Sequence, residues 1–592
     1  MKLRLAGIAG IVLALGACVA PTASSVSGPV AAPVPVAVAA PAPIEVQILA
    51  INDLHGNIEP PKQTVTVRGA NGDVKVPAGG VAYMAGAIEA LRQGQSNSIS
   101  VSAGDLIGAS PLTSALFLDE PTILAANQFG LELNAVGNHE FDRGSAELLR
   151  MQRGGCDKYT GREPCAVDRP FPGAKFQFLA ANVLTKDGTT LFPGTALKRF
   201  GPITIGFIGM TLKETGTLVT PSGVAGLSFA DEAATANALV PMLKRQGADA
   251  IVLLLHQGGF TDGYWDDPAC PGLHGDVLPI LAKLDPAIQL VISGHTHWVY
   301  RCELPNPGGG TRLLTSAGRY GTMLTDIRLT FDPASKALTG KKARFEVIQS
   351  APFDNAWGAV AQSNVVPIRA PDPAVAALVE RYRLAAQPMA ERVVAHLKTG
   401  LSGTLDEHGV SRLAEMIADA QYAWTKPAAR GGAQLALMNV SGARGDLVPR
   451  SDGTLNLAQL FALQPFGNGL IVQTLTGAQL KQLLEQQFTD PADPTMMVPS
   501  AGFTYTYDLT RPAGQRVVAL RLNGRPVDPA RRYRVTTNSF LASGGDNFTV
   551  LTMGTNRFDA GVDLDALEAW LKGNPLMPTG GRVKKVGAVP KA

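Results

Sequence analysis

The chain is poor in histidine and cysteine, two residue types that often bind metals or take part in catalysis. Its 592 residues include only eight histidines and five cysteines. The cysteines do not show the CxxC-type spacing of a structural zinc site, so a zinc finger is not supported. Charge of either sign is also nearly balanced, because 52 basic residues face 49 acidic ones. A chain this close to neutral gives no support for binding a polyanion such as a nucleic-acid polymer.

Long apolar runs are missing as well, except at the N-terminus. There, Lys2 and Arg4 precede an apolar stretch from Leu5 to Leu15, which is long enough for a signal-peptide core and too short to span a bilayer. The following Leu-Gly-Ala-Cys sequence ends at Cys18 and resembles the lipobox of bacterial lipoproteins. The sequence therefore predicts a lipoprotein signal peptide over residues 1–18 with a lipid anchor on Cys18. An ordinary secretory signal, with Cys18 incidental, is the alternative.

Charge is absent from the segment that follows. Residues 19–44 are rich in Pro, Ala, Val and Ser, a composition that favours extended, poorly packed chain. We interpret this segment as a tether between the membrane and a folded body. The expected location is the cell envelope of a bacterium, with the body facing the periplasm or the cell surface. An exported chain meets oxidising conditions, so we expect the disulfides Cys156–Cys165 and Cys270–Cys302.

What the sequence does contain is a repeated pattern at the ends of apolar runs. Between residues 45 and 330 such runs alternate with helical patterns, which is typical of stacked β and α layers. Five runs end in Asp, Asn or His, mostly beside a Gly: "IEVQILAI" before "NDLHG", "SISVSA" before "GD", "LELNAV" before "GNHEFD", "AIVLLL" before "HQGG", and "IQLVIS" before "GHTH". Because ligands of open α/β folds bind at the carboxyl ends of strands, we expect these ends to meet in one cleft.

Five of the eight histidines fall in these blocks, although His is a poor helix cap and each polar residue alone has a structural explanation. We therefore predict a metal centre. The candidate ligands are the acids, amide and imidazoles that follow the five strands: Asp53, His55, Asp105, Asn138, His256, His295 and His297.

The five blocks, in this order and spacing, resemble those of the calcineurin-like metallophosphoesterases, and within them the two-domain bacterial 5′-nucleotidase and UDP-sugar hydrolase family. The resemblance implies a four-layer metallophosphoesterase β-sandwich flanked by helices, followed by an α+β 5′-nucleotidase domain. It assigns Asp53, His55 and His297 to one divalent metal ion, and Asn138, His256 and His295 to a second. Asp105 is expected to bridge the two ions, whose identity (Zn, Mn, Co or Fe) the ligand types leave open.

The resemblance also implies the reaction. A hydroxide activated by the two metals is expected to attack phosphorus, with His139 as the catalytic histidine and Asp142 orienting its ring. A cationic imidazole would stabilise charge that develops on the phosphate or on the leaving oxygen. Asp142 is also a candidate helix N-cap, because "DRGSAELL" becomes amphipathic after it.

Three blocks in the second half carry the expected substrate residues, on loops beside apolar runs. By resemblance, Phe466 and Phe540 clamp a nucleobase, although for either of them alone a core aromatic is the better interpretation. Asn439 and Asp546 would hydrogen-bond the base or ribose, and Arg444 would contact a phosphate or the ribose. One departure concerns an arginine that the family uses to bind phosphate. His408 stands near its expected place, and Arg412 is a neighbouring candidate to replace it.

The sequence therefore predicts five segments: the signal peptide 1–18, the tether 19–44, a metallophosphoesterase domain 45–345, a linker with a connector helix 346–385, and a substrate-binding domain 386–585. The expected activity is hydrolysis of nucleotide phosphate esters by a 5′-nucleotidase, with UDP-sugar hydrolysis as a further activity. The alternatives are a 2′,3′-cyclic-nucleotide 2′-phosphodiesterase with 3′-nucleotidase activity, and a non-catalytic surface protein that binds nucleotides.

Overall fold

A computed structural model describes residues 42–219, 221–355, 358–491, 494–573 and 576–587. The predicted signal peptide, the lipobox with Cys18 and nearly all of the predicted tether lie outside these residues. Within the described ranges, no helix combines the length and the apolar character needed to cross a bilayer.

Two six-stranded sheets form the centre of the first half of the chain. The first sheet has the strand order β16-β15-β1-β4-β5-β6, with the bounds β1 (Ile44–Ile51), β4 (Ser98–Ser102), β5 (Leu131–Ala135), β6 (Gln177–Leu179), β15 (Met323–Phe331) and β16 (Leu338–Val347). The second has the order β13-β14-β12-β11-β9-β8, with the bounds β8 (Thr195–Phe200), β9 (Ile203–Met210), β11 (Ala250–Leu255), β12 (Ile288–Ser293), β13 (Val299–Pro305) and β14 (Thr311–Ala317). All five predicted strands are therefore confirmed, as β1, β4, β5, β11 and β12.

The strand directions explain why polar residues gather at one edge. β1, β4, β5 and β6 run parallel to one another, as do β9, β11, β12 and β14. Antiparallel strands lie only beside these parallel blocks. Parallel strands that are covered on both faces read as continuous apolar runs, which is how these strands appear in the sequence.

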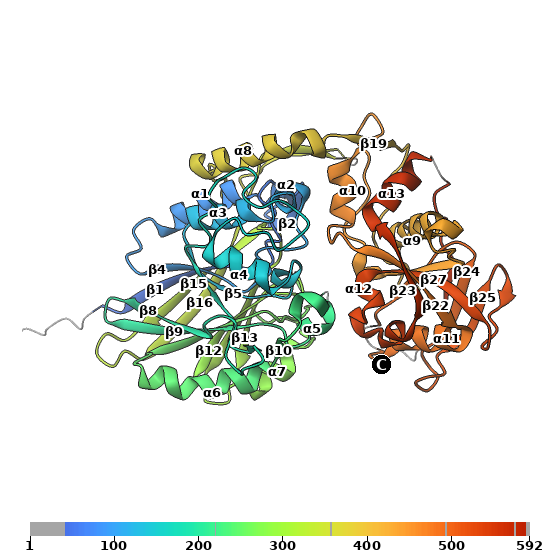
Figure 1. Cartoon of the computed structure of the whole chain (residues 1–592). Helices are drawn as coiled ribbons and strands as arrows, with labels where there is room; N and C mark the ends of the chain where they lie inside the picture. The colour runs from blue at the N-terminus through green and yellow to red at the C-terminus, as the bar shows by residue number, and fades with distance from the viewer. Residues whose placement is uncertain (1–41, 220, 356–357, 492–493, 574–575, 588–592) are drawn as a thin grey trace, which may run out of the picture. The chain divides into compact units, whose positions relative to one another are not determined.

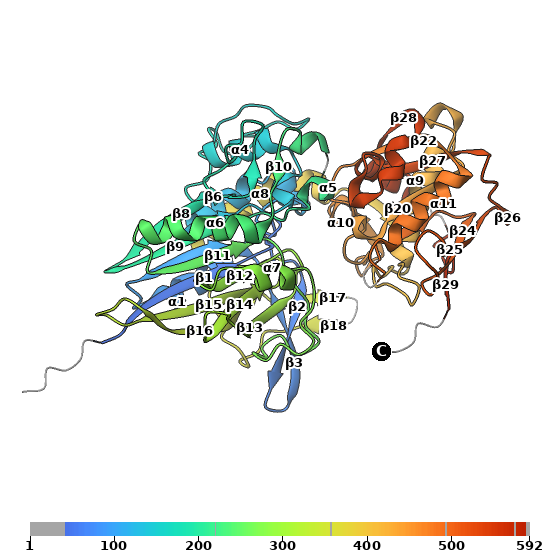
Figure 2. The same cartoon turned by 90° about the horizontal axis from the view of Figure 1, so that it is seen from below.

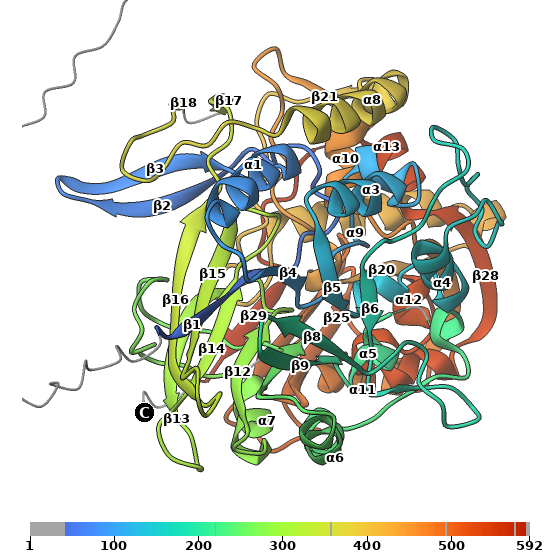
Figure 3. The same ribbon diagram turned by 90° about the vertical axis from the view of Figure 1, so that its left-hand side faces the viewer.

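Three apolar layers hold four layers of secondary structure together. Between the sheets, side chains such as Ile48, Phe207 and Leu254 are fully buried. A second layer joins the second sheet to the helices α6 (Glu232–Arg245) and α7 (Val277–Lys283). Figure 2 shows these two helices over the strands of that sheet, and Figure 3 shows them on the side of the sandwich opposite to α1, α3 and α8.

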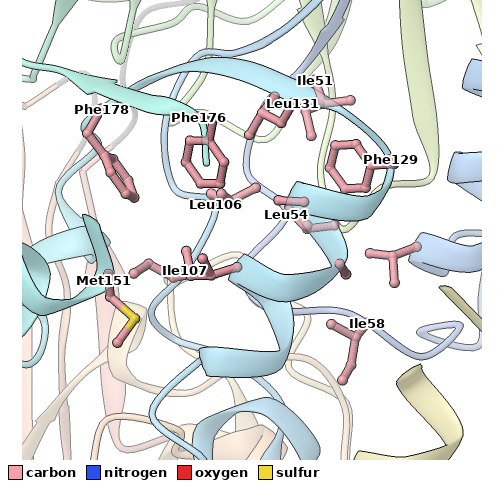
Figure 4. Packing of buried hydrophobic residues seen from close by; sticks show 14 of the residues in the cluster. Ile51, Leu54, Ile58, Leu106, Ile107, Phe129, Leu131, Met151, Phe176 and Phe178 are labelled. Carbon is pink, nitrogen blue, oxygen red and sulfur yellow. The ribbon is translucent and has the colours of Figure 1, made fainter. Parts of the chain in front are cut away.

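The third apolar layer covers the outer face of the first sheet. It packs against four helices, with the bounds α1 (Val81–Arg92), α3 (Glu120–Gln128), α4 (Ser145–Arg153) and α8 (Pro373–Ala390). Leu54, Leu106 and Ile107 belong to this layer and are almost completely buried (Figure 4). Leu54 stands between Asp53 and His55 in the sequence, and Leu106 and Ile107 directly follow Asp105. The apolar core thus anchors the two loops that carry these candidate ligands.

The predicted connector helix exists as α8. The Asp372 carboxylate accepts from the amide of Val375 and caps its N-terminus, and Pro373 occupies the first turn, where a proline costs no hydrogen bond. One face of α8, including Val375, Leu378 and Tyr382, packs into the third apolar layer. The connector is therefore part of the first half's core.

This half also contains smaller elements. Three of them are two-stranded: the hairpin of β2 (Gln63–Gly69) and β3 (Gly72–Ala78), the pair of β7 (Val183–Leu184) and β10 (Ser228–Phe229), and the pair of β17 (Phe353–Asn355) and β18 (Gly358–Val360). Two are short helices, α2 (Leu112–Ala115) and α5 (Thr215–Leu218). Both predicted disulfides are present, Cys156–Cys165 and Cys270–Cys302.

The second half contains a five-stranded and a four-stranded sheet (Figure 1). The first has the order β23-β20-β27-β22-β28, with β20 (Leu435–Asn439), β22 (Gly469–Thr476), β23 (Met497–Pro499), β27 (Arg532–Asn538) and β28 (Thr555–Val562). The other has the order β26-β25-β24-β29, with β24 (Phe503–Asp508), β25 (Val517–Leu522), β26 (Arg525–Pro526) and β29 (Val583–Val586), and a separate pair joins β19 (Val393–His396) to β21 (Thr454–Asn456).

The helices of this half have the bounds α9 (Arg412–Thr425), α10 (Leu457–Leu463), α11 (Gly477–Glu485), α12 (Ser539–Ala542) and α13 (Asp563–Lys572). Leu480, Leu483 and Leu484 of α11 are fully buried in one apolar cluster with strands of both sheets. Strands and helices are mixed here without a long parallel block, so the half is α+β. The predicted fold class is confirmed for both halves.

Candidate functional site

The carboxyl ends of β1, β4, β5, β11 and β12 bring the seven predicted ligands together from both sheets. Two groups form, in each of which one ligand atom per residue lies within 4.8 Å of the others. The first group is Asp53, His55 and His297, and the second is Asp105, His256 and His295. Asn138 joins the second group through its side-chain oxygen, Oδ1.

In the first group, hydrogen bonding defines which nitrogen of His55 is free. Its Nδ1 lies 3.0 Å from the carbonyl oxygen of Gly108, which can only accept, so Nδ1 carries the proton. Nε2 therefore presents a lone pair, and it lies 3.0 Å from Nε2 of His297. Nε2 of His297 is in turn 3.5 Å from Oδ1 of Asp53. Potential ligand atoms held this close together suit a cation between them.

The second group repeats this arrangement. Nδ1 of His256 lies 2.8 Å from the carbonyl oxygen of Ala103, which can only accept, so Nδ1 carries a proton. Burial acts to lower the pKa of His256, but the carboxylates of Asp105, Asp53 and Glu140 outweigh it and raise the pKa to about 10, so Nε2 is also protonated here and would lose its proton to bind a metal ion. That nitrogen is 3.1 Å from Oδ1 of Asn138 and 3.1 Å from Oδ2 of Asp105. The same Asp105 oxygen is 3.6 Å from Nε2 of His55 in the first group. Asp105 thus lies between the two groups, where a carboxylate can serve two ions.

Burial sets the protonation of these side chains. It lowers the pKa of His55 and of His295 to about 3, so both imidazoles are neutral near neutral pH and can act as ligands. It also raises the pKa of Asp53 to about 7, because burying a carboxylate is costly and the nearby Asp105 adds repulsion, which the opposing effect of His256 does not cancel. Neutral imidazoles, carboxylates and an amide oxygen form a donor set that fits divalent transition metals.

The backbone of the site is strained in a way that the sequence does not reveal. Five of the seven candidate ligands have a positive φ, between 47° and 70°, a region that non-glycine residues rarely adopt: Asp53, His55, Asp105, His295 and His297. Gly137 is required by close approach, because a Cβ there would lie 2.2 Å from Oδ1 of Asp105. Strain concentrated in this way is typical of functional sites.

His139 and Asp142 form a hydrogen-bonded pair beside the two groups. Nδ1 of His139 lies 2.9 Å from Oδ2 of Asp142, which also accepts from the amide of Ala109 at 2.8 Å. Burial acts to lower the pKa of His139, but the carboxylates of Asp142 and Asp105 outweigh it and hold the pKa above its ordinary value. The N-cap of α4 is Gly144, without a side-chain capping bond, so Asp142 does not cap this helix.

Glu140, inside the same motif, was given no role from the sequence. Its buried carboxylate accepts from the amides of Asp105 at 2.9 Å, Leu106 at 2.9 Å and Gly137 at 2.7 Å. It therefore ties the loop after β4 to the loop after β5. The "GNHEFD" block points to Glu140 as a residue of the site. The block does not indicate that its side chain binds backbone amides of the neighbouring loops.

A second polar cluster lies at the ends of β20 and β27. Nδ2 of Asn439 donates to Asp546 and to Ser441, each at 2.8 Å, and Ser441 donates to Asp546 at 3.0 Å. Asn538 donates to Oδ1 of Asn439 at 3.1 Å. The structure thus brings together two predicted substrate residues, Asn439 and Asp546, that are 107 positions apart.

The two predicted clamp residues, Phe466 and Phe540, are both half-buried. The guanidinium carbon of Arg444 lies 5.2 Å from the centre of the Phe466 ring. The Phe466 ring also lies nearly parallel to the imidazole of His139, with their centroids 5.9 Å apart. A residue from the second half thus contacts the reactive pair of the first.

Comparisons with known proteins agree with this geometry. The calcineurin-like phosphoesterase family model matches residues 46–299, and the model of the 5′-nucleotidase C-terminal domain matches residues 393–553. The chain belongs to the 5′-nucleotidase family. It is a phosphoesterase hydrolase with two His/Asp clusters of the kind that hold metals in dimetal phosphoesterases.

Relatives of this 5′-nucleotidase-family chain have varied names. It is 28% identical to the Endonuclease YhcR of Bacillus subtilis over 530 residues, which cover 89% of this chain and 39% of that protein. It is 24% identical to the NAD 5′-nucleotidase of Haemophilus influenzae over 558 residues, 85% of each chain. The crystal structure of the 5′-nucleotidase precursor from Thermus thermophilus has the same fold, with a TM-score of 0.72 and 24% identity over 92% of this chain and all of that one.

The two candidates for the family's phosphate-binding arginine are engaged elsewhere. Nε of Arg412 donates to the carbonyl oxygen of Pro578 at 3.0 Å. Nδ1 of His408 accepts from the amide of Lys585 at 3.4 Å, and its Nε2 lies 3.7 Å from Glu407. Both side chains of this nucleotidase-family chain therefore contact residues near its C-terminal end. These contacts do not support Arg412 or His408 as a replacement for the family's phosphate-binding arginine.

Proposed function

We propose that this chain is an exported, dimetal-dependent nucleotidase that hydrolyses the phosphate ester of 5′-nucleotides, with UDP-sugars as further substrates. The observation that carries the nucleotide assignment is the stacking of Phe466 against His139. An aromatic side chain suited to stacking on a nucleobase lies next to the histidine expected to act on the phosphate. The names of the relatives, an endonuclease and an NAD 5′-nucleotidase, support a nucleotide-type substrate.

In this proposal Asp53, His55 and His297 hold one divalent ion, while Asn138, His256 and His295 hold the other and Asp105 bridges them. When bound, such a pair of ions polarises the phosphoryl group and provides a nucleophile at neutral pH. The chain's own contribution is to fix the ligand atoms and to keep the imidazoles of His55 and His295 neutral.

His139 would act on the side of the leaving group. Its Nδ1 proton is directed at Asp142, and the raised pKa keeps a second proton available on Nε2. That proton can be donated to the departing nucleoside oxygen, or its charge can stabilise that oxygen. Arg444, close to both Phe466 and the imidazoles, would bind an anionic oxygen of the substrate.

The proposed location is outside the cytoplasm, with the body attached to the cell envelope through a lipid on Cys18. The two disulfides support export, because such bonds persist in oxidising compartments. We keep the five segments predicted from the sequence. Cys18→Ser should leave an unlipidated precursor, and normal membrane fractionation of that variant after detergent-free washing would rule out the anchor.

Substrate class can be tested with purified protein, added Mn, Co or Zn, and a panel of 5′-, 3′- and cyclic nucleotides, UDP-sugars and bis-p-nitrophenyl phosphate. The double variant Phe466→Ala with Phe540→Ala should raise KM for AMP at least about tenfold, because base stacking contributes roughly 1–3 kcal/mol. Hydrolysis of bis-p-nitrophenyl phosphate, which has no base, should change far less. Phe558→Ala, at an exposed phenylalanine of the same half, is the control. Unchanged AMP kinetics in the double variant would show that the two phenylalanines do not clamp the base.

A further inference from the structure

The short loop Gly108–Ala109 has no functional side chain, yet its backbone contacts two groups of the reaction centre. The carbonyl oxygen of Gly108 accepts from Nδ1 of His55 at 3.0 Å. The next amide, of Ala109, donates to Oδ2 of Asp142 at 2.8 Å, and that carboxylate also holds His139. Displacement of this one peptide would therefore disturb a candidate metal ligand and the His139–Asp142 pair together.

The conformational preferences of the loop residues do not explain the backbone conformation of the loop. Gly108 and Ala109 have φ values of 84° and 46°, and the second is unfavourable for a residue with a Cβ. The loop also packs tightly against the reactive pair, since a Cβ on Gly108 would lie 2.1 Å from the carbonyl oxygen of His139. A strained, close-packed loop of this kind persists only when surrounding groups hold it.

Asp119 is the side chain that holds it. It is fully buried, directly before α3, and Oδ2 accepts from the amide of Gly108 at 3.3 Å. Ser114 donates to its Oδ1 at 2.7 Å, and Nη1 of Arg143 forms an ion pair with it. These partners keep the pKa of Asp119 below its ordinary value against the opposing effect of burial. Arg143 directly follows Asp142, so the ion pair also fixes the segment that carries the reactive pair.

We propose that Asp119, paired with Arg143, is a positioning residue for phosphoester hydrolysis. It fixes the Gly108–Ala109 peptide, and this peptide orients the His55 ring and the Asp142 carboxylate. The inference rests on the roles given to His55, His139 and Asp142 in the proposed function, and it does not depend on which phosphate ester is the natural substrate.

A neighbouring ion pair provides a matched control. Glu120, the next residue, is also fully buried, and its Oε1 accepts from Nη1 of Arg150 at 2.8 Å. This pair also joins the start of α3 to the region of α4. Its other contact, however, is the amide of Cys165 at 2.9 Å, in the disulfide loop, and not the Gly108 peptide. Loss of either ion pair should lower the stability of the fold. Only loss of the Asp119–Arg143 pair should also change the geometry of the reaction centre.

The test compares Asp119→Asn with Glu120→Gln in the metal-loaded protein, using AMP and p-nitrophenyl phosphate. We expect Asp119→Asn to lower kcat for AMP about tenfold to hundredfold, the usual cost of losing a group that orients a metal ligand. The loss should be smaller on p-nitrophenyl phosphate, whose leaving group depends less on His139. KM should change little. Glu120→Gln should lower the melting temperature by a similar amount and keep kcat near the wild-type value.

Arg143 supplies a second, partly exposed position, in case Asp119→Asn does not fold. Arg143→Met should reproduce the kcat loss on AMP, and Arg143→Lys should restore part of it. Equal kcat losses in Asp119→Asn and Glu120→Gln, or a wild-type kcat in Arg143→Met, would overturn the proposal. If the wild-type protein hydrolyses p-nitrophenyl phosphate and no nucleotide, the proposed substrate class fails, while the comparison of the two variants on that ester still tests the positioning role.

Discussion

The two polar clusters of this chain have opposite hydrogen-bonding character. At the strand ends of the sandwich, Nε2 of His55 lies 3.0 Å from Nε2 of His297, and Nε2 of His256 lies 3.1 Å from Oδ1 of Asn138. At the ends of β20 and β27, by contrast, Asn439, Ser441 and Asp546 pair each donor with an acceptor. The first cluster gathers atoms that can ligate cations, while the second is satisfied by its own hydrogen bonds.

The difference shows how the two halves divide the work. Burying carboxylates and imidazoles on a strained backbone is costly, so the binding energy of the metals would offset the strain and desolvation of the first cluster. The second cluster is preorganised and can exchange its internal hydrogen bonds for bonds to a ligand. Chemistry is therefore expected in the first half and recognition in the second. Of the four substitutions below, ordered from the largest expected effect to the smallest, the first three test this division and the fourth tests the stability of the second half.

Asp105→Ala should have the largest effect. Its Oδ2 lies near His55 and His256 in the two groups, so its loss should impair both metal sites. We expect activity to fall at least about ten-thousandfold, because the metals supply both the nucleophile and charge stabilisation. Metal content by mass spectrometry and AMP hydrolysis measure the change. Asp326→Asn, at a buried acid of β15 that belongs to neither ligand group, should keep both metals. Full metal content in Asp105→Ala would show that this carboxylate is no bridge.

His139→Gln should leave the metals in place and impair the chemistry. His139 is in neither metal group and contacts Asp142 instead. Loss of a general acid typically costs about a hundredfold to ten-thousandfold in kcat. Steady-state kinetics on AMP, with metal content measured in parallel, distinguish a loss of catalysis from a loss of metal. A kcat close to wild type would remove His139 from the reaction.

Asn439→Ala should affect recognition alone. Asn439 connects Asp546, Ser441 and Asn538, so its removal disorders the second cluster without touching the first. We expect KM for AMP to rise about tenfold, in line with one or two lost hydrogen bonds. Turnover of bis-p-nitrophenyl phosphate should be retained. An equal loss on both substrates would mean that the two halves do not divide the work in this way.

Asp563→Asn should change stability and have the smallest effect on activity. Burial raises the pKa of Asp563 from 3.8 to about 7, so the unfolded chain ionises at a lower pH than the folded one. Folding then loses stability as the pH rises from about 4 to about 7, and the neutral amide avoids that loss. The amide oxygen of the variant can still accept from Nε2 of Gln464, which donates to Oδ2 of Asp563 at 3.5 Å.

We therefore expect Asp563→Asn to raise the free energy of unfolding by roughly 1–3 kcal/mol near pH 8, with the gain disappearing toward pH 4. Denaturant unfolding at several pH values measures this difference. A gain that does not vary with pH would show that the carboxylate is not the source of the destabilisation.

The sequence predicted the parts of the centre that depend on local pattern. Apolar runs ending in Asp, Asn or His located β1, β4, β5, β11 and β12 correctly, because the period and length of a buried strand are local properties. Both disulfide pairs followed from their context. The positive φ angles of the candidate ligands were not foreseen, since motif residues other than glycine give no sign of a left-handed backbone.

Long-range packing accounts for what the sequence did not reveal. Asp119 stands in no motif, and its contact with Gly108 exists only because α3 packs behind the loop. The stacking of Phe466 on His139 joins residues more than three hundred positions apart. Neither relation has a local pattern from which it could be predicted. The expected roles of the ligands and of the substrate residues remain predictions that the substitutions above address.

The most direct test of the dimetal phosphoesterase assignment is a metal titration of protein that has been stripped with a chelator. AMP hydrolysis is measured while Mn, Co or Zn is added, and bound metal is counted in the same samples. Activity should be absent without metal and should reach its maximum only when two ions are bound per chain, since Asp105 stands between two ligand groups. Full activity in the stripped protein, or with one ion per chain, would contradict the account.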